Sequence, residues 1–342
     1  MTPTPTFPTI DISPFLHPSS PTTLQTTAHA FFAACAHPGF FYLTNHNLPL
    51  PLTARVLDLA RDFFLHASPE EKARIKRRDA GVEKGDGARG YQVIGDNITE
   101  GKRDWHEAID WYRPVRESEP QVVRENVNGH VDGNVNGHDA ERERPFQLLQ
   151  GMNTWPTSPP EFRKVYEEYI LLMLELGTAV VRAMGMALGD GMEDIFVNNT
   201  RESWWVMRAI GYPPLPPDST RDESGGVSCG AHCDYGCVTL LLADETKGAL
   251  QAWVEDDEKE GRWVDVDPKP GALVVNIGDM MERWSGGKWK ATRHRVVHRG
   301  EGYRVSVPFF FEPDWNAKVP GLPHEGEVVY GKYLEAKVRG NF

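Results

Sequence analysis

Six side chains that could bind a metal or an anion lie in the C-terminal half of the chain. They are His232, Asp234, His294, His298, Arg304 and Ser306. Two histidines and one carboxylate form the ligand set of many non-haem iron(II) oxygenases, and this set leaves three metal positions open for substrate and dioxygen. These residue types therefore point to an iron centre, provided that the fold brings distant segments together.

His232 and Asp234 have the spacing that a metal site on a β-strand requires, because residues i and i+2 of a strand point to the same side. The apolar run 238–243 follows directly. A single His-x-Asp pair often occurs without function. A third ligand at a suitable position is therefore needed before the pattern predicts a metal site. His294 and His298 share the same strand parity, and spacing alone leaves both as candidates.

Arg304 and Ser306 are also two positions apart. An arginine beside a hydroxyl group is well suited to hold a carboxylate through two hydrogen bonds. The segment 299–302, Arg-Gly-Glu-Gly, separates this pair from the two histidines. We expect a turn there, with the two strands paired as a hairpin.

Three cysteines lie close to the His-x-Asp pair, at Cys229, Cys233 and Cys237. Their Cys-x3-Cys-x3-Cys spacing matches neither a zinc ribbon nor the common iron–sulfur patterns. Cysteine also packs well as a small residue in protein interiors. We interpret the three as buried neighbours of the site rather than as ligands.

Short strands would position these residues. Between residues 204 and 313, β-type runs are separated by turns rich in Pro, Gly and Asp, which is typical of a β-sandwich or barrel. Helical spacing instead marks residues 24–35 and 52–63, and Ser68 is expected to cap a further short helix.

The longest helix is expected to start at Ser158, as its cap, and to end at Gly189. Residues 116–144 differ from the rest, since they are polar and repeat Asn-Val-Asn-Gly-His at 126–130 and 134–138. Such a composition does not build a packed core, so we expect a disordered insertion there.

Composition narrows the class of protein. The 342 residues are 40% hydrophobic and 25% charged, as in globular proteins. A net charge of −12 disfavours nucleic acid and anionic membranes as partners. No apolar run approaches the roughly 18 residues of a membrane span, and neither a signal peptide nor a disulfide framework is recognisable. We expect a cytoplasmic monomer with a small-molecule ligand.

The chain resembles the 2-oxoglutarate- and iron(II)-dependent dioxygenases of the isopenicillin N synthase-like family, over nearly its whole length apart from residues 116–144. The shared motifs include "PGFFYLTNH", "GYPP", "HCDYGCVTLLLAD", "WVDVDPKPGALVVNIGD", "TRHRV" and "RVSVPFFFEP". The resemblance implies an α+β fold, namely a double-stranded β-helix (jelly-roll) barrel with flanking helices and an N-terminal helical/β cap. It also implies one oxygenase domain over 1–342, with an N-terminal region at 1–115, the insertion at 116–144, the barrel core at 204–313 and a C-terminal tail at 314–342.

The resemblance assigns the metal ligands. His232 and Asp234 match the family's His-x-Asp, and His294 matches the histidine that lies about ten residues before its Arg-x-Ser. His298 lies only six residues before Arg304. It is therefore expected to be a structural histidine.

The same resemblance assigns the 2-oxoglutarate site. Arg304 and Ser306 match the Arg-x-Ser that binds the distal carboxylate of 2-oxoglutarate. Tyr212 matches a tyrosine whose hydroxyl group commonly reaches that co-substrate. Ile210 stands where the family usually has an asparagine, so the polar contact of that asparagine is not expected here.

The implied reaction is the oxidation of a small organic metabolite with O2 through an Fe(IV)-oxo species, with release of succinate and CO2. Hydroxylation, desaturation and cyclisation all remain open, and a role in secondary metabolism is expected. Two alternatives are a 2-oxoglutarate-independent Fe(II) oxidase or cyclase, and a non-enzymatic relative that binds a small acid. His106 and Glu107 are acid/base residues in a stretch that lies near the active-site mouth in the family, so either could contact substrate.

Overall fold

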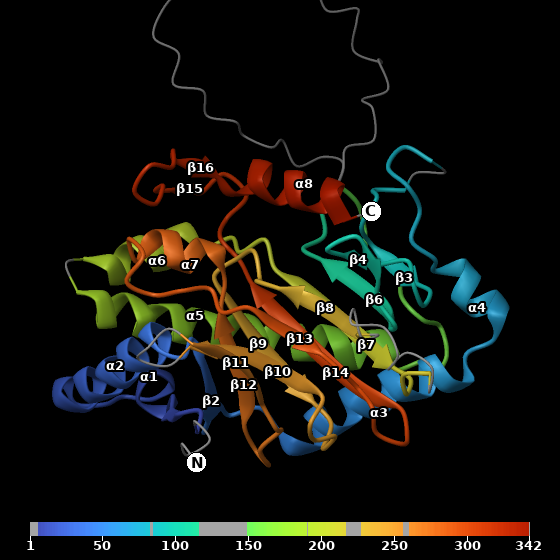
Figure 1. Cartoon of the computed structure of the whole chain (residues 1–342), viewed down its shortest axis with the longest axis horizontal. Helices are drawn as coiled ribbons and strands as arrows, with labels where there is room; N and C mark the ends of the chain where they lie inside the picture. The colour runs from blue at the N-terminus through green and yellow to red at the C-terminus, as the bar shows by residue number, and fades with distance from the viewer. Residues whose placement is uncertain are drawn as a thin grey trace, which may run out of the picture.

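The computed structural model of the chain describes residues 6–82, 85–115, 149–189, 191–216, 227–255 and 260–341. The predicted insertion at 116–144 lies outside these residues. The described residues form two β-sheets with helices packed on the larger one (Figure 1).

The two sheets together form the expected jelly-roll barrel. The eight-stranded sheet has the order β1-β2-β12-β9-β14-β7-β6-β3, and the four-stranded sheet has the order β11-β10-β13-β8. The larger sheet consists of β1 (Thr9–Asp11), β2 (Phe40–Thr44), β12 (Leu273–Ile277), β9 (Val238–Ala243), β14 (Arg304–Phe311), β7 (Val206–Tyr212), β6 (Glu107–Tyr112) and β3 (Gly90–Gln92). The smaller sheet consists of β11 (Gly261–Asp265), β10 (Leu250–Glu255), β13 (His294–Val296) and β8 (Cys229–His232).

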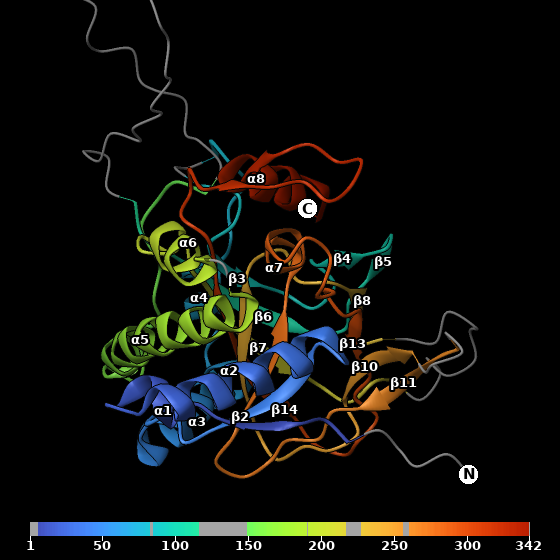
Figure 2. The same cartoon turned by 90° about the vertical axis from the view of Figure 1, so that its left-hand side faces the viewer.

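Helices cover one side of the larger sheet, and the smaller sheet lies on the other side (Figure 2). The covering helices are α1 (Ser13–Leu16), α2 (Pro21–Ala36), α3 (Leu50–His66) and α5 (Phe162–Leu188). The shorter elements are α4 (Pro69–Arg74), α6 (Met192–Asn199), α7 (Asp279–Trp284), α8 (Tyr330–Asn341), the β4–β5 pair (Ile98–Thr99 and Lys102–Arg103) and the β15–β16 pair (Lys318–Val319 and Val328–Val329). Figure 2 also shows α8 across one end of the barrel.

The predicted helices of the N-terminal part are confirmed. Two of them correspond to α2 and α3, each of which buries one apolar face. Ser68 caps α4, because its hydroxyl oxygen accepts the N–H of Glu71 at 3.2 Å and Pro69 occupies the first turn.

The predicted cap of α5 is wrong, although its predicted end is confirmed. The helix begins at Phe162 and not near Ser158, and it ends at Gly189, whose φ is +73°. Ser158 and Pro159 each precede a proline, which disfavours helical backbone at both positions. The N–H of Phe162 instead donates to the Pro159 carbonyl at 3.0 Å, in a turn ahead of the helix.

Helix α5 is long and apolar enough, by length and composition, to cross a membrane. The prediction that no apolar run approaches the length of a membrane span is therefore wrong. One such helix is weak evidence for a span, because a core helix passes the same test. Here α5 packs against α2, α3, α6, β9 and β14. Burial in this core accounts for its apolar composition.

The chain between β13 and β14 crosses from one sheet to the other. β13 pairs with β10 and β8, whereas β14 pairs with β7 and β9. The hairpin predicted across 299–302 is therefore wrong, because a jelly roll can place consecutive strands in different sheets. As a result, Arg304 and His294 project from different sheets of the barrel.

Gly177 allows α5 to approach β14 closely. A Cβ atom added at this position would overlap the ring of Phe311, which is the last residue of β14. Any larger residue at position 177 would therefore push the helix or the ring away.

We expect Gly177→Ala to lower the free energy of unfolding by about 1–3 kcal/mol, because overpacking outweighs the roughly 1 kcal/mol that alanine gains in helix propensity. Thr178→Ala, at the next and exposed position of the same helix, is the control and should change stability by less than about 0.5 kcal/mol. Urea unfolding followed by circular dichroism measures both. Stabilisation by Gly177→Ala would show that the contact with Phe311 does not constrain the helix.

Candidate metal centre

His232, Asp234 and His294 come together between the two sheets. His232 ends β8 and pairs in register with His294, which begins β13. Asp234 lies two residues beyond β8, and the ligand atoms of the three side chains all lie within 4.8 Å of one another. Asp234 Oδ1 is 3.7 Å from His232 Nε2 and 3.6 Å from His294 Nε2.

Backbone carbonyl groups orient both imidazole rings. His232 Nδ1 is 2.8 Å from the Gly230 carbonyl oxygen, and His294 Nδ1 is 3.0 Å from that of Thr292. A carbonyl oxygen can only accept a hydrogen bond, so each Nδ1 carries the proton. Each Nε2 is then left with a lone pair for a metal ion.

The carboxylate of Asp234 is held from the opposite direction. Asn276 Nδ2 donates to Asp234 Oδ2 at 2.6 Å, and the Thr239 hydroxyl group donates to the same oxygen. Burial alone would raise the pKa of Asp234, but His294, His232 and these hydrogen bonds lower it below its ordinary value. Oδ1 therefore remains as a charged acceptor facing the two imidazoles. Two imidazole nitrogens and one carboxylate oxygen at these separations fit a divalent iron ion.

The structure does not bring His298 to this group. Its Nε2 is 2.9 Å from the Gly302 carbonyl oxygen, and its backbone N–H donates to Ser228 Oγ at 2.9 Å. The side chain is buried and hydrogen-bonded away from the other two histidines.

Arg304, Ser306 and Tyr212 form a second group on β14 and β7. Arg304 is opposite Tyr212 in the sheet register, and its guanidinium carbon lies 4.7 Å from the centre of the Tyr212 ring. Arg304 Nη1 donates to Ser306 Oγ at 3.5 Å. Burial raises the pKa of the Tyr212 hydroxyl group to about 12, so this group stays protonated.

Arg304 is a buried cation without an acidic partner. It is 2% exposed, its Nε lacks a hydrogen-bond partner, and no carboxylate of the described residues pairs with it. Burying an unpaired charge is costly. The group is therefore arranged to receive an anion from outside the chain.

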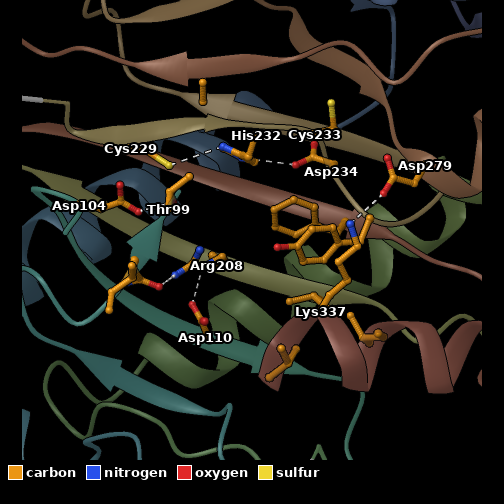
Figure 3. A pocket seen from close by; sticks show the side chains of 18 of the residues that line it. Thr99, Asp104, Asp110, Arg208, Cys229, His232, Cys233, Asp234, Asp279 and Lys337 are labelled. Carbon is orange, nitrogen blue, oxygen red and sulfur yellow. Dashed lines mark hydrogen bonds and ion pairs between the residues drawn. The ribbon is translucent and has the colours of Figure 1, made fainter. Parts of the chain in front are cut away.

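A cavity of about 450 Å³ adjoins two of the three candidate ligands, and Figure 3 shows side chains of its wall. His232 and Asp234 form part of this wall. Other polar residues of the wall come from β6, β7, α7, α8 and the segments flanking the β4–β5 pair, and they include Asn97, Asp104, His106, Arg208, Asp279 and Lys337.

Sequence reasoning did not identify most of these wall residues. Asp104, Arg208 and Lys337 carry no recognisable motif, and their elements meet only in the folded chain. Asp279 lies in the first turn of α7. It also accepts a hydrogen bond from the Tyr333 hydroxyl group and lies 3.4 Å from Lys337 Nζ.

The neighbours His106 and Glu107 have different roles. Glu107 points away from the cavity and accepts hydrogen bonds from Lys72 Nζ at 3.0 Å, and from the hydroxyl groups of Tyr91 and Tyr303 at 2.6 Å each. It therefore connects helix and sheet. His106 immediately precedes β6 and lines the cavity.

The cysteines lie around the site at different depths. Cys237 is fully buried, and the Cys233 thiol donates to the Ala291 carbonyl at 3.3 Å. Cys229 Sγ lies 3.9 Å from His232 Nδ1 and groups with Asp104 and His106 within 4.8 Å. Cys229 thus lies next to His232 Nδ1, whereas His232 Nε2 is the ring nitrogen near Asp234.

Glu312 is a buried acid just beyond β14 that also lines the cavity. It is 4% exposed, and its Oε2 has no hydrogen-bond partner within the described part of the chain. Burial raises the pKa of this carboxyl group to about 8, and the nearby charge of Asp234 adds to the rise.

Two family models match the chain. The model described as the 2OG-Fe(II) oxygenase superfamily matches residues 192–313. The model described as non-haem dioxygenase in morphine synthesis N-terminal matches residues 7–132.

Curated relatives match over almost the whole chain. Homoarginine-6-hydroxylase 2-ODD-C23 of Glycine max is 35% identical, covering 98% of this chain and 97% of the relative. The 2-oxoglutarate-Fe(II) type oxidoreductase hxnY of Emericella nidulans is 32% identical, covering 98% and 89%. Among solved structures, a full-length Neurospora crassa protein in complex with alpha-KG and thymine superposes with a TM-score of 0.75 at 23% identity, covering 98% of this chain and 96% of that chain. This likeness supports the same fold.

Glu312 gives a test of the buried charges at this site. Between its ordinary pKa of 4.5 and its folded pKa of about 8, the native state binds more protons than the unfolded state, so the free energy of unfolding falls as pH rises. Glu312→Gln mimics the protonated acid. We expect the metal-free wild type to lose at least about 1 kcal/mol relative to this variant between about pH 6 and about pH 9. Denaturant unfolding in the presence of a chelator at both pH values measures this, and a pH-independent difference would contradict it.

Proposed function

The chain belongs to the 2OG-Fe(II) oxygenase superfamily, and we propose that it hydroxylates a small basic amino acid or a close derivative of one. The protein is a 2-oxoglutarate-dependent dioxygenase that uses Fe(II), 2-oxoglutarate and O2 to oxidise a small metabolite. Hydroxylation, and a basic amino acid as substrate, are supported by the relatives named homoarginine-6-hydroxylase.

We propose His232, Asp234 and His294 as the Fe(II) ligands. The observation that carries this proposal is the convergence of Asp234 Oδ1 and both Nε2 atoms, with each side chain held by its own hydrogen bonds. When bound there, iron with 2-oxoglutarate and O2 supplies the oxidant for a C–H bond, with succinate and CO2 as co-products. The chain itself fixes the ligand geometry and lines the adjoining cavity.

We propose Arg304, Ser306 and Tyr212 as the receptor for the distal carboxylate of 2-oxoglutarate. The buried, unpaired guanidinium of Arg304 supplies the charge, and the Ser306 hydroxyl group supplies a second donor. The ring of Tyr212 lies against the guanidinium and limits its rotation. The charge of the co-substrate would then compensate a cation that the protein leaves unpaired.

Three further expectations remain predictions. They are that the enzyme acts as a monomer, that it is cytoplasmic, and that neither nucleic acid nor a membrane is a partner. Gel filtration of the purified enzyme at several concentrations tests the first of these.

The ligand assignment predicts opposite outcomes for the two histidines near β13. In anaerobic titrations we expect the Fe(II) protein to develop a visible absorption band when 2-oxoglutarate is added. His294→Ala should abolish the band and weaken Fe(II) binding more than about 100-fold, since loss of an outer partner alone costs about 10- to 100-fold.

His298→Gln is the matched control, because glutamine keeps a donor for the Gly302 carbonyl, and the band should persist in this variant. Loss of the band in His298→Gln but not in His294→Ala would overturn the ligand assignment. A band that forms with iron alone would favour a 2-oxoglutarate-independent oxidase.

The co-substrate assignment predicts that Arg304→Met raises the dissociation constant for 2-oxoglutarate at least about 100-fold, because truncating one partner of a buried charge pair costs several kcal/mol. Fe(II) affinity should stay unchanged, since Arg304 projects from a different sheet from the two histidines. Arg295→Met is the control, as Arg295 stacks on Trp263 at 4.1 Å and away from this group. Titration of the visible band with 2-oxoglutarate measures each constant. Equal constants in Arg304→Met and wild type would exclude the proposed carboxylate receptor.

A further inference from the structure

Four polar side chains on one side of the cavity are not used by the metal centre or by the co-substrate group. They are Asn97 and Asp104 on either side of the β4–β5 pair, His106 next to β6, and Arg208 on β7. All four lie in the same cavity wall as His232. A ligand bound to them would therefore lie beside the metal centre.

Arg208 is held in a fixed orientation at this wall. Its Nε donates to Asp110 Oδ1 at 2.7 Å (Figure 3). Gln92 Nε2 donates to the other oxygen of Asp110, also at 2.7 Å. Arg208 Nη2 donates to Asn97 Oδ1 at 3.2 Å. These hydrogen bonds, as found among the described residues, leave Nη1 open, and the side chain is about one-fifth exposed, at 21%.

Asn97 adds a second donor beside Arg208. Because a guanidinium group has no acceptor, the oxygen of the Asn97 amide must face Arg208, which directs Nδ2 elsewhere. This Nδ2 is buried and has no hydrogen-bond partner among the described residues, and Asn97 as a whole is 9% exposed. A buried donor without an acceptor is costly, so Asn97 Nδ2 and Arg208 Nη1 together provide two donors for one carboxylate.

His106 and Asp104 provide acceptors a short distance away. His106 Nδ1 donates to the Ser228 carbonyl at 2.7 Å, so Nε2 carries a lone pair, and Nε2 is buried without a partner in the described chain. Burial and the charge of Arg208 lower the pKa of His106 to about 3, which keeps the ring neutral. Asp104 accepts from Gly230 N–H and from the Thr99 hydroxyl group, each at 2.8 Å, and this fixes its carboxylate near His106.

We propose that Asn97, Asp104, His106 and Arg208 bind the head group of a free α-amino acid, with its carboxylate on Arg208 and Asn97 and its ammonium group on Asp104 and His106. The amino-acid side chain then extends toward the metal centre. This inference rests on the proposed function and adds to it the subsite that selects the substrate class.

The charges favour a zwitterion over a simple carboxylic acid. Arg208 already has an acidic partner in Asp110, unlike Arg304, so an additional anion alone would leave a net negative charge buried there. An α-amino acid brings one charge of each sign and places each against its complement.

A metal ion is the other ligand that Asp104, His106 and Cys229 could hold, because their ligand atoms lie within 4.8 Å of one another. Two features favour the amino acid. A metal ion brings only positive charge next to the guanidinium of Arg208, whereas the amino acid also places its carboxylate against that guanidinium. A metal would also leave the Asn97 donor without an acceptor.

The test measures how tightly amino acids and their truncated analogues bind to the anaerobic enzyme loaded with Fe(II) and 2-oxoglutarate. Binding is followed by the shift that a bound substrate causes in the visible band. A separate aerobic assay measures O2 consumption with the same compounds. L-Homoarginine, L-arginine and L-lysine are each compared with the amine that lacks the carboxylate and with the acid that lacks the α-amino group. In the wild type we expect each truncated probe to bind at least about 100-fold more weakly than its parent, since the site's buried polar groups are then left unpaired.

Variants assign the two halves of the head group. The double variant Arg208→Met/Asp110→Asn removes a charge pair and not a single charge. In this variant, loss of the probe's carboxylate should change affinity less than about 3-fold, whereas loss of its amino group should still weaken binding about 100-fold. Asp104→Asn should show the reverse. Arg113→Met is the control and should retain both penalties, because Arg113 pairs with Glu202 and does not line the cavity.

The outcomes are distinguishable. If the wild type forms no band with Fe(II) and 2-oxoglutarate, the proposed function itself fails. If the band forms but no free amino acid binds, or the truncated probes bind as tightly as their parents, the head-group subsite is overturned. If metal analysis finds two ions per chain, and Cys229→Ser removes one of them, the cluster is a metal site instead.

Discussion

The carboxylate of Asp234 connects the two sheets of the barrel, and the geometry of the site depends on how it is held. One oxygen accepts hydrogen bonds from Thr239 on β9 and Asn276 on β12, both in the eight-stranded sheet. The other oxygen faces His232 and His294 in the four-stranded sheet. The separation between the sheets therefore sets the distance between carboxylate and imidazoles, and barrel packing directly controls the donor geometry.

The candidate metal ligands could be predicted from the sequence because of their local spacing, although Asp234 lies beyond the end of β8 and not on a strand. His232 and Asp234 lie two residues apart at the end of a strand, and the register of β8 against β13 brings His294 opposite His232. Spacing alone did not distinguish His294 from His298; the resemblance to a known family did. The strand run between 204 and 313 likewise indicated a barrel. Apolar spacing indicated the presence of α2 and α3, and the Ser68 cap indicated the start of α4.

Long-range topology was not predictable from the same signals. The hairpin across 299–302 was wrong, because a turn motif does not reveal that β13 and β14 belong to different sheets. The cavity wall was missed for a similar reason. Arg208, Asp104 and Lys337 are separated by long stretches of chain, and nothing local to each indicates that they face one cavity. Their chemistry depends on partners such as Asp110, which burial rather than sequence spacing brings into contact.

One structural feature bears on how this scaffold can diversify. The proposed metal ligands and the Arg304 group lie on strands or directly beside them, where register fixes each position. Helix α8 contributes Leu334, Lys337 and Val338 to the cavity wall from outside both sheets. Mutations on this helix can reshape the chamber without shifting any strand pairing. Substitutions on α8 can therefore change substrate choice while the proposed metal ligands and the Arg304 group stay unchanged. Because these two parts of the site belong to different elements, one barrel can give rise to many specificities.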